Sequence, residues 1–325
     1  MTDRVAAFVR DIEAVPDVYE RLAGGDQLAQ SFRQVLRGPR GLPRRVVLTG
    51  LGSSRYAAFA VEARLQAAGI EAVVEPASTD TPVEPAADRL CVAISSSGRT
   101  PEVVAAALRY RETGTVLAIT RDAGSPLADA AHATAVLPVE AEESGIATTT
   151  YAATLAALLH LASALGAPGG PITPEEEILA GARAARAALG SRDAWLPGAL
   201  DVLRPIEAMS VLAPWSERGQ AEQVALLFRE GPRRSADVFE TAEWLHVGVY
   251  TALPGTVALV LAGSPADAEV ARTITGRSGQ VIAVRDPEDG ISWPAAAVVP
   301  SPAGLGRFVG PALLAAELWR RHAGG

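Results

Sequence analysis

The sequence predicts an α/β protein made of two doubly wound parallel-sheet (flavodoxin-like) subdomains in tandem. Short apolar runs rich in β-branched residues alternate with longer segments of helical periodicity along most of the chain. One stretch rich in glycine and proline and ending in acids, residues 166–177, interrupts this alternation. The order of elements is similar on both sides of it, which indicates an internal duplication of one α/β unit.

The first half contains the elements of one such unit. Residues 1–35 have the pattern of one or two amphipathic helices, broken near Val15 and Pro16. Apolar runs predict strands at residues 44–50, 71–78, 89–95, 115–120 and 133–139. Helical periodicity predicts helices at residues 54–69, 100–114, 125–131 and 148–166. We therefore expect an N-terminal helical segment at 1–35 and a first subdomain at 36–168.

The second half repeats the alternation after a helix at residues 175–190. The expected strands are residues 208–214, 256–263, 280–286 and 295–300. The expected helices are residues 217–230, 266–279 and 309–325. This second subdomain is expected to span 169–325.

Composition excludes several classes of function. The net charge of −8 argues against affinity for nucleic acid or an anionic membrane. The N-terminus lacks the apolar core of a signal peptide, and no apolar run reaches the roughly 18 residues that a membrane span needs. The single cysteine, Cys91, lies in a strand-like run, so we interpret it as a core residue and expect a reducing cytoplasm. Lysine is absent, which excludes a lysine Schiff base or general base.

Two turns rich in hydroxyl groups each follow a predicted strand and precede a predicted helix. Hydroxyls and backbone N–H groups at a helix N-terminus favour an anion, and two such turns at neighbouring strand ends suit a phosphate group. Capping alone would explain Thr100 before Pro101, but it does not explain three consecutive serines. The residues of the two turns are Gly52, Ser53, Ser54, Ser95, Ser96, Ser97 and Thr100.

Other kinds of site have little support in the sequence. The first turn lacks the third glycine of a dinucleotide fingerprint, because Arg55 stands in its place. His132 and His160 do not have the spacing of metal ligands. We therefore expect neither a metal ion nor a cofactor.

With a third turn, residues 145–149, the chain resembles the SIS (sugar isomerase) domain family. The likeness is to the isomerase half of glucosamine-6-phosphate synthase (glutamine–fructose-6-phosphate aminotransferase). The family's G-S-S, S-x-S-G-x-T and G-V-A-S-T turns correspond to residues 52–54, 95–100 and 145–149. The resemblance implies that the first two turns bind the phosphate of a sugar. It also implies that Ile146, Ala147 and Thr148 line the sugar.

The resemblance extends to two candidate catalytic residues in the second half. The family has a helix ending in A-L-K-x-K-E, which corresponds to residues 225–230 and implies that Glu230 moves a proton between C1 and C2. A later G-E-L-K-H-G stretch corresponds to residues 242–248 and implies that His246, from the neighbouring subunit, assists ring opening. A carboxylate base and an imidazole proton shuttle suit that chemistry. Taken singly, Glu230 is also consistent with an exposed helix-end residue and His246 with a packed core histidine.

The chain departs from the synthase in several places. Leu227 occupies the position of a lysine, and the synthase's C-terminal tail, which carries another lysine, has no counterpart. No glutaminase domain precedes the isomerase half, so amidotransfer from glutamine is not expected. Arg233 and Arg234, which follow Glu230, suit either an anionic substituent of a substrate or a solvated surface.

We therefore expect an isomerase, or a deaminase or deglycase, that acts on a 6-phospho (amino)sugar through an enediol or enolamine. The resemblance implies a homodimer whose active site is shared between subunits. A non-catalytic sugar-phosphate sensor is the alternative, and a nucleotide-binding oxidoreductase is a weaker one.

Overall fold

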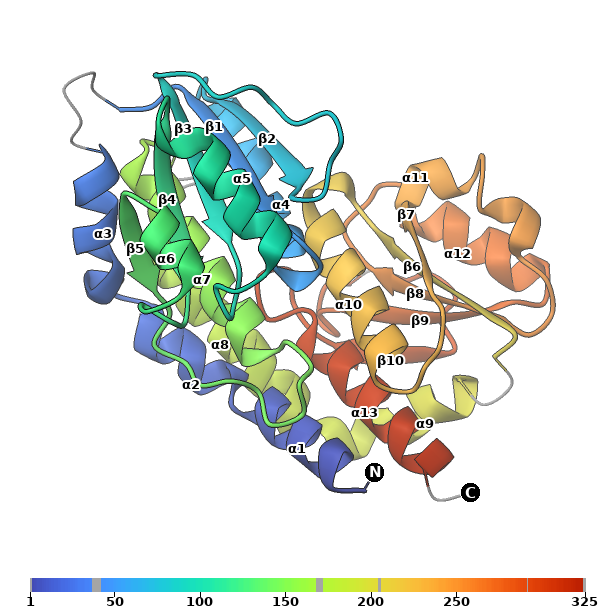
Figure 1. Ribbon diagram of the computed structural model, residues 1–325. Coiled ribbons are helices and arrows are strands. Elements are labelled where there is room, and N and C mark those ends of the chain that lie inside the picture. The colour runs from blue at the N-terminus through green and yellow to red at the C-terminus, as the bar shows by residue number, and fades with distance from the viewer. Residues whose placement is uncertain (1, 37–41, 168–171, 204–205, 291, 324–325) are drawn as a thin grey trace. The chain divides into compact units, whose positions relative to one another are not determined.

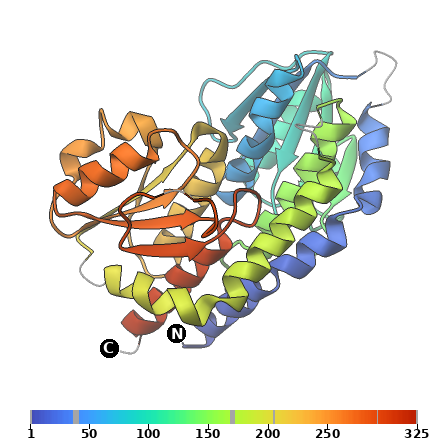
Figure 2. The same ribbon diagram turned by 180° about the vertical axis from the view of Figure 1, so that it is seen from behind.

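In the computed structural model the chain forms two five-stranded parallel sheets with helices on both faces of each (Figures 1 and 2). The structure describes residues 2–36, 42–167, 172–203, 206–290 and 292–323. The predicted class, doubly wound α/β with two sheets, is confirmed. None of the helices in these ranges is long and apolar enough to cross a membrane.

The chain divides into two compact units, each built around one sheet. The first-sheet unit comprises residues 18–141 and 149–179, and the second-sheet unit comprises residues 1–17, 142–148 and 180–325. The division into these two units does not follow the subdomain boundaries predicted at residues 36–168 and 169–325, and those boundaries remain a prediction. Its main consequence is that residues 142–148, which contain most of the third turn, pack with the second sheet.

Three helices precede the first strand. They are α1 (Thr2–Glu13), α2 (Val15–Leu22) and α3 (Asp26–Leu36). The expected break near Val15 and Pro16 is confirmed, because α1 ends at Glu13 and α2 begins at Val15, but the expected number of helices, one or two, was wrong. Pro16 lies in the first turn of α2, where the backbone N–H that proline lacks would have no partner within the helix.

The first sheet has the strand order β2-β1-β3-β4-β5. Its strands are β1 (Arg45–Gly50), β2 (Glu71–Pro76), β3 (Arg89–Ile94), β4 (Thr115–Thr120) and β5 (Ala133–Val136). Its helices are α4 (Ser53–Ala67), α5 (Pro101–Arg111), α6 (Pro126–Ala130) and α7 (Thr149–Ala164). Helices α4 and α7 pack together on one face, and α5 and α6 pack together on the other (Figures 1 and 2). Every residue of β3 is buried, as expected for a central strand covered on both faces.

The second sheet, β7-β6-β8-β9-β10, repeats this pattern of strand order. Its strands are β6 (Ala208–Ala213), β7 (Asp237–Glu240), β8 (Thr256–Leu261), β9 (Gln280–Arg285) and β10 (Ala297–Pro300). The associated helices are α8 (Pro174–Gly190), α9 (Arg192–Val202), α10 (Arg218–Glu230), α11 (Thr241–Trp244), α12 (Asp267–Gly276) and α13 (Val309–Ala323).

Local sequence patterns did not predict α9, β7 or α11. Helix α9 contains Pro197 and Gly198, which normally mark a break. Strand β7 has only four residues, Asp-Val-Phe-Glu, and carries acids at both ends. Its parallel pairing with β6 stabilises the strand, whose own sequence has little strand propensity.

We expect Gly98→Ala to destabilise the protein because no side chain fits there. Gly98 has a positive φ of 65°, and a Cβ atom would lie 2.0 Å from Ser125 Oγ. Overpacking costs about 1–3 kcal/mol, and a left-handed backbone adds roughly 1–2 kcal/mol for alanine. Urea denaturation followed by circular dichroism measures the loss.

Gly69→Ala is the matched control for this substitution. Gly69 also has a positive φ, 77°, but nothing lies within 4 Å of a Cβ atom placed there. It should lose only the backbone contribution of roughly 1–2 kcal/mol. Equal losses in the two variants would mean that Ser125 does not restrict the second turn.

Candidate functional site

Both predicted phosphate loops lie at the switch point of the first sheet. Strands β1 and β3 are parallel neighbours, and Thr49 pairs with Ala93 near their ends. The chain leaves β1 to reach β2 on one side and leaves β3 to reach β4 on the other. The loops that follow β1 and β3 therefore leave the same edge of the sheet at adjacent positions, which is where doubly wound sheets bind ligands.

The first loop presents unused hydroxyl groups at the start of α4. The helix begins at Ser53, after Gly52 with a positive φ of 53°. The side chains of Ser53 and Ser54 are half-buried, and neither has a hydrogen-bond partner among the described residues. The N–H groups of the first helical turn likewise have no acceptor within the helix. This end of α4 can therefore donate several hydrogen bonds to an anion.

The second loop holds its own shape through its hydroxyl groups. Ser95 Oγ and Thr100 Oγ1 lie 2.9 Å apart and share a hydrogen bond, and Thr100 makes no side-chain cap on α5. Thr100 is the N-cap residue of α5 and Pro101 lies in its first turn, as the capping interpretation expects, but the Thr100 hydroxyl bonds to Ser95 and not to a helix N–H group. Ser97 is exposed, and its Oγ accepts the Arg99 N–H at 3.2 Å. Because a hydroxyl that accepts a hydrogen bond can still donate one, Ser97 keeps its proton for a ligand.

Arg121, which the sequence analysis did not single out, contacts the second loop. It follows β4, the strand next to β3, and its Nε donates to Ser96 Oγ at 3.0 Å. The signal was present in the sequence, because "TVLAIT" is a third buried strand whose end must lie at the same edge as the ends of β1 and β3.

The third loop packs in the second-sheet unit, where two helices hold it. Arg4 of α1 donates from Nε and Nη2 to the Ser144 carbonyl oxygen at 3.2 and 2.7 Å. Asp11 Oδ2 accepts from the Ser144 N–H at 3.1 Å and from its Oγ at 2.6 Å. Gln223 of α10 donates from Nε2 to the Ala147 carbonyl oxygen at 2.8 Å. These contacts fix the backbone of residues 144–147.

The side chains predicted to line a sugar are mostly turned inward. Ile146 is 1% exposed, and Thr148 is fully buried with no partner for its Oγ1 among the described residues. The Thr148 N–H donates to Glu142 Oε1 at 3.0 Å. Ala147, whose carbonyl oxygen Gln223 holds, is half-buried.

Glu230 lies at the C-terminal end of α10, beside the third loop. It lies on the same face of α10 as Gln223, which is two turns earlier and holds the third loop. Burial raises the pKa of the Glu230 carboxyl above its ordinary value. The charge of Arg233 opposes this shift, Glu142 adds to it, and Arg4 opposes it. A carboxyl with this environment can take up a proton closer to neutral pH than an exposed glutamate can.

Within one chain, His246 lies at the opposite edge of the second sheet from Glu230. Helix α10 returns from the carboxyl edge, so Glu230 is at the amino edge, whereas His246 follows β7 and α11 at the carboxyl edge. The His246 side chain is exposed, and no hydrogen bond or ion pair joins it to Glu230 among the described residues. It is therefore not the packed core histidine of the alternative interpretation.

At the corresponding switch point of the second sheet, the protein's own side chains occupy the strand ends. Arg307 is 2% exposed and donates to Glu217 Oε2 at 2.6 Å and to the Ala262 carbonyl oxygen at 2.5 Å. Asp267 Oδ2 accepts from the N–H groups of Gly263 and Ser264, at 2.7 and 3.0 Å. A carboxylate thus takes the backbone donors that an anionic ligand would need.

The remaining candidates have structural roles. Cys91 is fully buried, and burial raises the pKa of its thiol to about 12, so the interpretation as a core residue is confirmed. Among the described residues, no three His, Cys, Asp or Glu side chains gather as metal ligands would.

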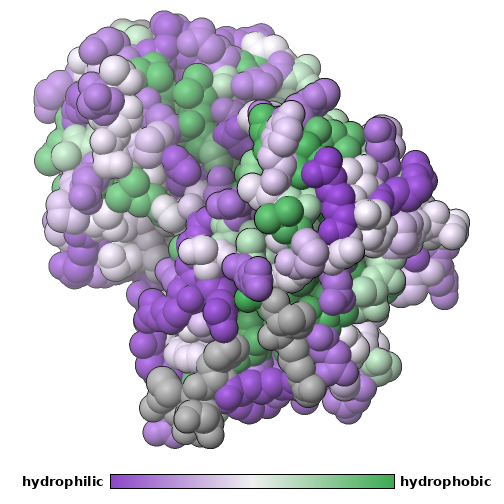
Figure 3. Space-filling view, turned by 90° about the vertical axis from the view of Figure 1, so that its right-hand side faces the viewer, coloured by the Kyte–Doolittle hydropathy of each residue, from purple (hydrophilic) through white to green (hydrophobic). Residues whose placement is uncertain are grey.

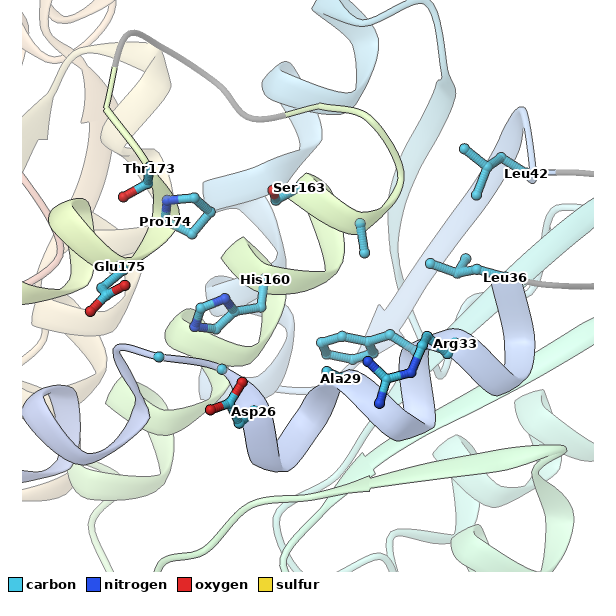
Figure 4. Close-up of a pocket in the computed structure, with 14 residues that line it drawn as sticks. Asp26, Ala29, Arg33, Leu36, Leu42, His160, Ser163, Thr173, Pro174 and Glu175 are labelled. Atoms are coloured by element: carbon cyan, nitrogen blue, oxygen red, sulfur yellow. The ribbon is translucent and has the colours of Figure 1, made fainter.

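A cavity of about 520 Å³ lies beside α3 and α7, but no predicted site residue lines it (Figure 4). His160 in that cavity is hydrogen-bonded through Nε2 to the Leu22 carbonyl oxygen at 3.0 Å.

Comparison with known proteins connects these loops to a domain family. The SIS domain model matches residues 43–164, which contain both predicted phosphate loops. No curated protein matches the sequence.

Three solved structures share the fold over nearly the whole chain. The C-terminal domain of glucosamine-fructose-6-phosphate aminotransferase from Francisella tularensis is 16% identical, with a TM-score of 0.74, over 97% of this chain and 94% of that one. Tagatose-6-phosphate ketose/aldose isomerase from Escherichia coli is 19% identical, with a TM-score of 0.78, over 98% and 93%. Glucosamine-6-phosphate deaminase from Thermotoga maritima is 16% identical, with a TM-score of 0.72, over 97% and 95%.

We expect Glu230→Gln to raise the free energy of unfolding at pH 7 and above. A raised pKa means that the folded state holds the Glu230 proton more tightly than the unfolded state does. Wild-type stability is then lost as pH rises from the ordinary glutamate pKa to the raised one, and glutamine avoids that loss. The gain should disappear below the ordinary pKa, where both states carry the proton. Urea denaturation from pH 4 to pH 8 gives the comparison.

Asp122→Asn is a control of opposite sign. The Gly124 N–H and the Arg99 side chain lower the pKa of the Asp122 carboxyl, so asparagine should cost stability at neutral pH. A Glu230→Gln variant less stable than wild type at pH 7 would contradict the assignment of Glu230 as a desolvated acid.

Proposed function

We propose that this protein binds a phosphorylated sugar or amino sugar, because the SIS domain model matches residues 43–164. The loop between β1 and α4 and the loop between β3 and α5 would hold its phosphate. The observation that carries this proposal is the pair of hydroxyl-rich helix starts at one switch point, where Ser53, Ser54 and Ser97 have protons to donate. Phosphate oxygens are acceptors that match such donors.

We further propose that the protein acts on this sugar, as an aldose–ketose isomerase or as a deaminase or deglycase. Glu230 removes the proton from the carbon next to the carbonyl or imine carbon. The electrons of the broken C–H bond form the C=C bond of an enediol or enolamine, and the oxygen or nitrogen takes up a proton. In isomerisation the proton returns to the neighbouring carbon, while the hydroxyl on the first carbon loses its proton and becomes the new carbonyl. In deamination the same carbon protonation, with loss of an N–H proton, converts the enolamine into an imine, and water then adds to the imine carbon as ammonia leaves. The raised pKa of Glu230 supports this role.

The proposed ring-opening group is His246 of a second subunit in a homodimer. Its exposed position at the opposite edge of the sheet from Glu230 supports a role outside its own chain's site. Exposed apolar side chains flank it, with Val247 at 51%, Tyr250 at 76% and Leu253 at 59% exposure. The face of the molecule in Figure 3 carries scattered hydrophobic residues among polar ones. We also propose a reducing cytoplasm as its location, because a chain with a single cysteine cannot form an internal disulfide.

A non-catalytic sugar-phosphate sensor is the second candidate. Leu227, which stands where the synthase has a lysine, is fully buried and cannot take part in proton transfer. A protein that keeps the serine loops but lacks the cation at this position would bind a sugar phosphate without converting it. The two candidates differ in one measurable property, the exchange of a sugar C–H proton with solvent.

We expect the wild-type protein to catalyse exchange of solvent deuterium into a sugar phosphate. A thermal-shift screen of phosphorylated sugars first selects the ligand. NMR in D₂O then follows C2 of glucosamine 6-phosphate, C1 of fructose 6-phosphate, or the equivalent carbon of the best ligand. Glu230→Gln should slow the exchange by about 10²–10⁴, the usual contribution of a general base.

The outcomes of this experiment separate the candidates. Stabilisation by a sugar phosphate without exchange in the wild-type protein would support the sensor and contradict the enzyme. Stabilisation by NAD but by no sugar phosphate would contradict both.

A mixture of Glu230→Gln and His246→Ala subunits should regain activity that neither variant has alone. If each site takes Glu230 from one subunit and His246 from the other, a mixed dimer has one intact site. Random reassociation gives mixed dimers in half of the population, so about a quarter of wild-type activity should return. Unfolding the variants together and refolding them, followed by the exchange assay, tests this. Refolded single variants are the control, and an inactive mixture would mean that each site uses one chain.

A further inference from the structure

We propose that Arg121 is a phosphate-binding residue of the two loops at the first switch point, where its guanidinium supplies a positive charge that forms no ion pair with a carboxylate. This inference rests on the proposed function, because it names a residue of the same site. The sequence resemblance does not include it, since the three matching turns end before or begin after Arg121.

The position of Arg121 is fixed by several hydrogen bonds to one residue of the second loop. Its backbone N–H donates to the Ser96 carbonyl oxygen at 3.0 Å. Its side-chain Nε donates to Ser96 Oγ at 3.0 Å. Thr120, the last residue of β4, also donates from Oγ1 to the Ser96 carbonyl oxygen, at 3.2 Å. The guanidinium group therefore lies against the second loop, and it is half-buried there.

The Arg121 guanidinium makes no hydrogen bond or ion pair with a carboxylate among the described residues, although its charge is one of those that lower the pKa of Asp122. Asp122, its neighbour in sequence, instead accepts from Arg99 Nη2 at 2.8 Å and from the Gly124 N–H at 2.8 Å. Within the same ranges, Arg121 Nη1 and Nη2 make no hydrogen bond, and neither is a buried unsatisfied atom. The two terminal nitrogens, with their positive charge, are thus available to a ligand.

Charge and hydrogen-bond geometry both favour a phosphate as that ligand. The serines and backbone N–H groups of the loops are neutral, whereas a phosphate monoester carries close to two negative charges at pH 7. A guanidinium offers paired N–H donors that match phosphate oxygens. In addition, Ser96 Oγ accepts from Arg121 Nε, so the Ser96 hydroxyl proton points elsewhere and can be donated. Arg121 would both contact the phosphate and orient Ser96 toward it.

Arg99 provides an internal comparison. It belongs to the second loop and has the same charge, but its side chain is 60% exposed and paired with Asp122. Its charge is therefore screened and already used. A charge effect that came merely from being near the loop would be similar for Arg99 and Arg121.

The test measures binding of inorganic phosphate and of the best sugar phosphate from the thermal-shift screen, by isothermal titration calorimetry at low salt. Arg121→Gln should weaken binding of both by about 10- to 100-fold, the usual effect of losing a charge-assisted hydrogen bond. Arg121→Lys, which keeps the charge, should recover part of this loss. Arg99→Gln should change binding by less than about threefold. The unliganded variants are compared with wild type by urea denaturation.

The possible results separate this inference from the proposed function. If Ser97→Ala weakens phosphate binding while Arg121→Gln binds as wild type does, the role of Arg121 is overturned and the phosphate site stands. Equal losses for Arg99→Gln and Arg121→Gln would also overturn it. If the wild-type protein binds neither probe, the proposed function itself fails. If Arg121→Gln does not fold, Arg121→Ala is measured instead. It should also bind phosphate about 10- to 100-fold more weakly, and wild-type binding by Arg121→Ala would overturn the role of Arg121.

Discussion

The parallel pairing of β1 with β3 is the constraint on which the candidate site depends. The strand ends are so close that a Cβ atom at Gly50 would lie 3.0 Å from the Ile94 carbonyl oxygen. A larger residue at that position would push the first loop away from the second. Because the chain turns in opposite directions after the two strands, the helices that follow do not compete for the space between the loops. Hydroxyl groups from two distant segments, residues 52–54 and 95–100, can therefore serve one ligand.

The second sheet has the same strand order but different chemistry at the equivalent point. There Asp267 takes the backbone N–H groups, and Arg307 is enclosed by Glu217 and two strand-end carbonyl oxygens. Burial raises the pKa of both carboxyls, while Arg307 opposes the shift. This arrangement stabilises the loops without leaving donors for an anion. Topology alone therefore does not make a site, and side chains at the strand ends decide which sheet has one.

Sequence patterns predicted what depends on local periodicity and on strand ends. Both sheets and the positions of residues 52–54 and 95–100 followed from runs such as "RLCVAI", whose burial leaves one edge for polar groups. Arg121 was missed because a single arginine after a strand has no distinctive pattern, and its role depends on the neighbouring Ser96. The association of residues 142–148 with the second sheet was also unpredictable, because it depends on long-range contacts of Arg4, Asp11 and Gln223. Helix α9 and strand β7 were missed because tertiary packing overrode weak local signals.

Burial and the charges around it give Glu230 its chemical character, and residues 142–148 supply one of these charges through Glu142. Gln223 and Glu230 share one face of α10. Gln223 holds the loop that contains Glu142, and the charge of Glu142 raises the pKa of Glu230. Arg4 joins the two, since it anchors Ser144 and its charge also acts on Glu230. A carboxyl that is desolvated, and faced by one acid and two arginines, is costly for folding and is tolerated where a protonatable group is useful. The loop thus acts on Glu230 through fixed charges and burial, while the side chains of Ile146 and Thr148 keep its backbone in place from within.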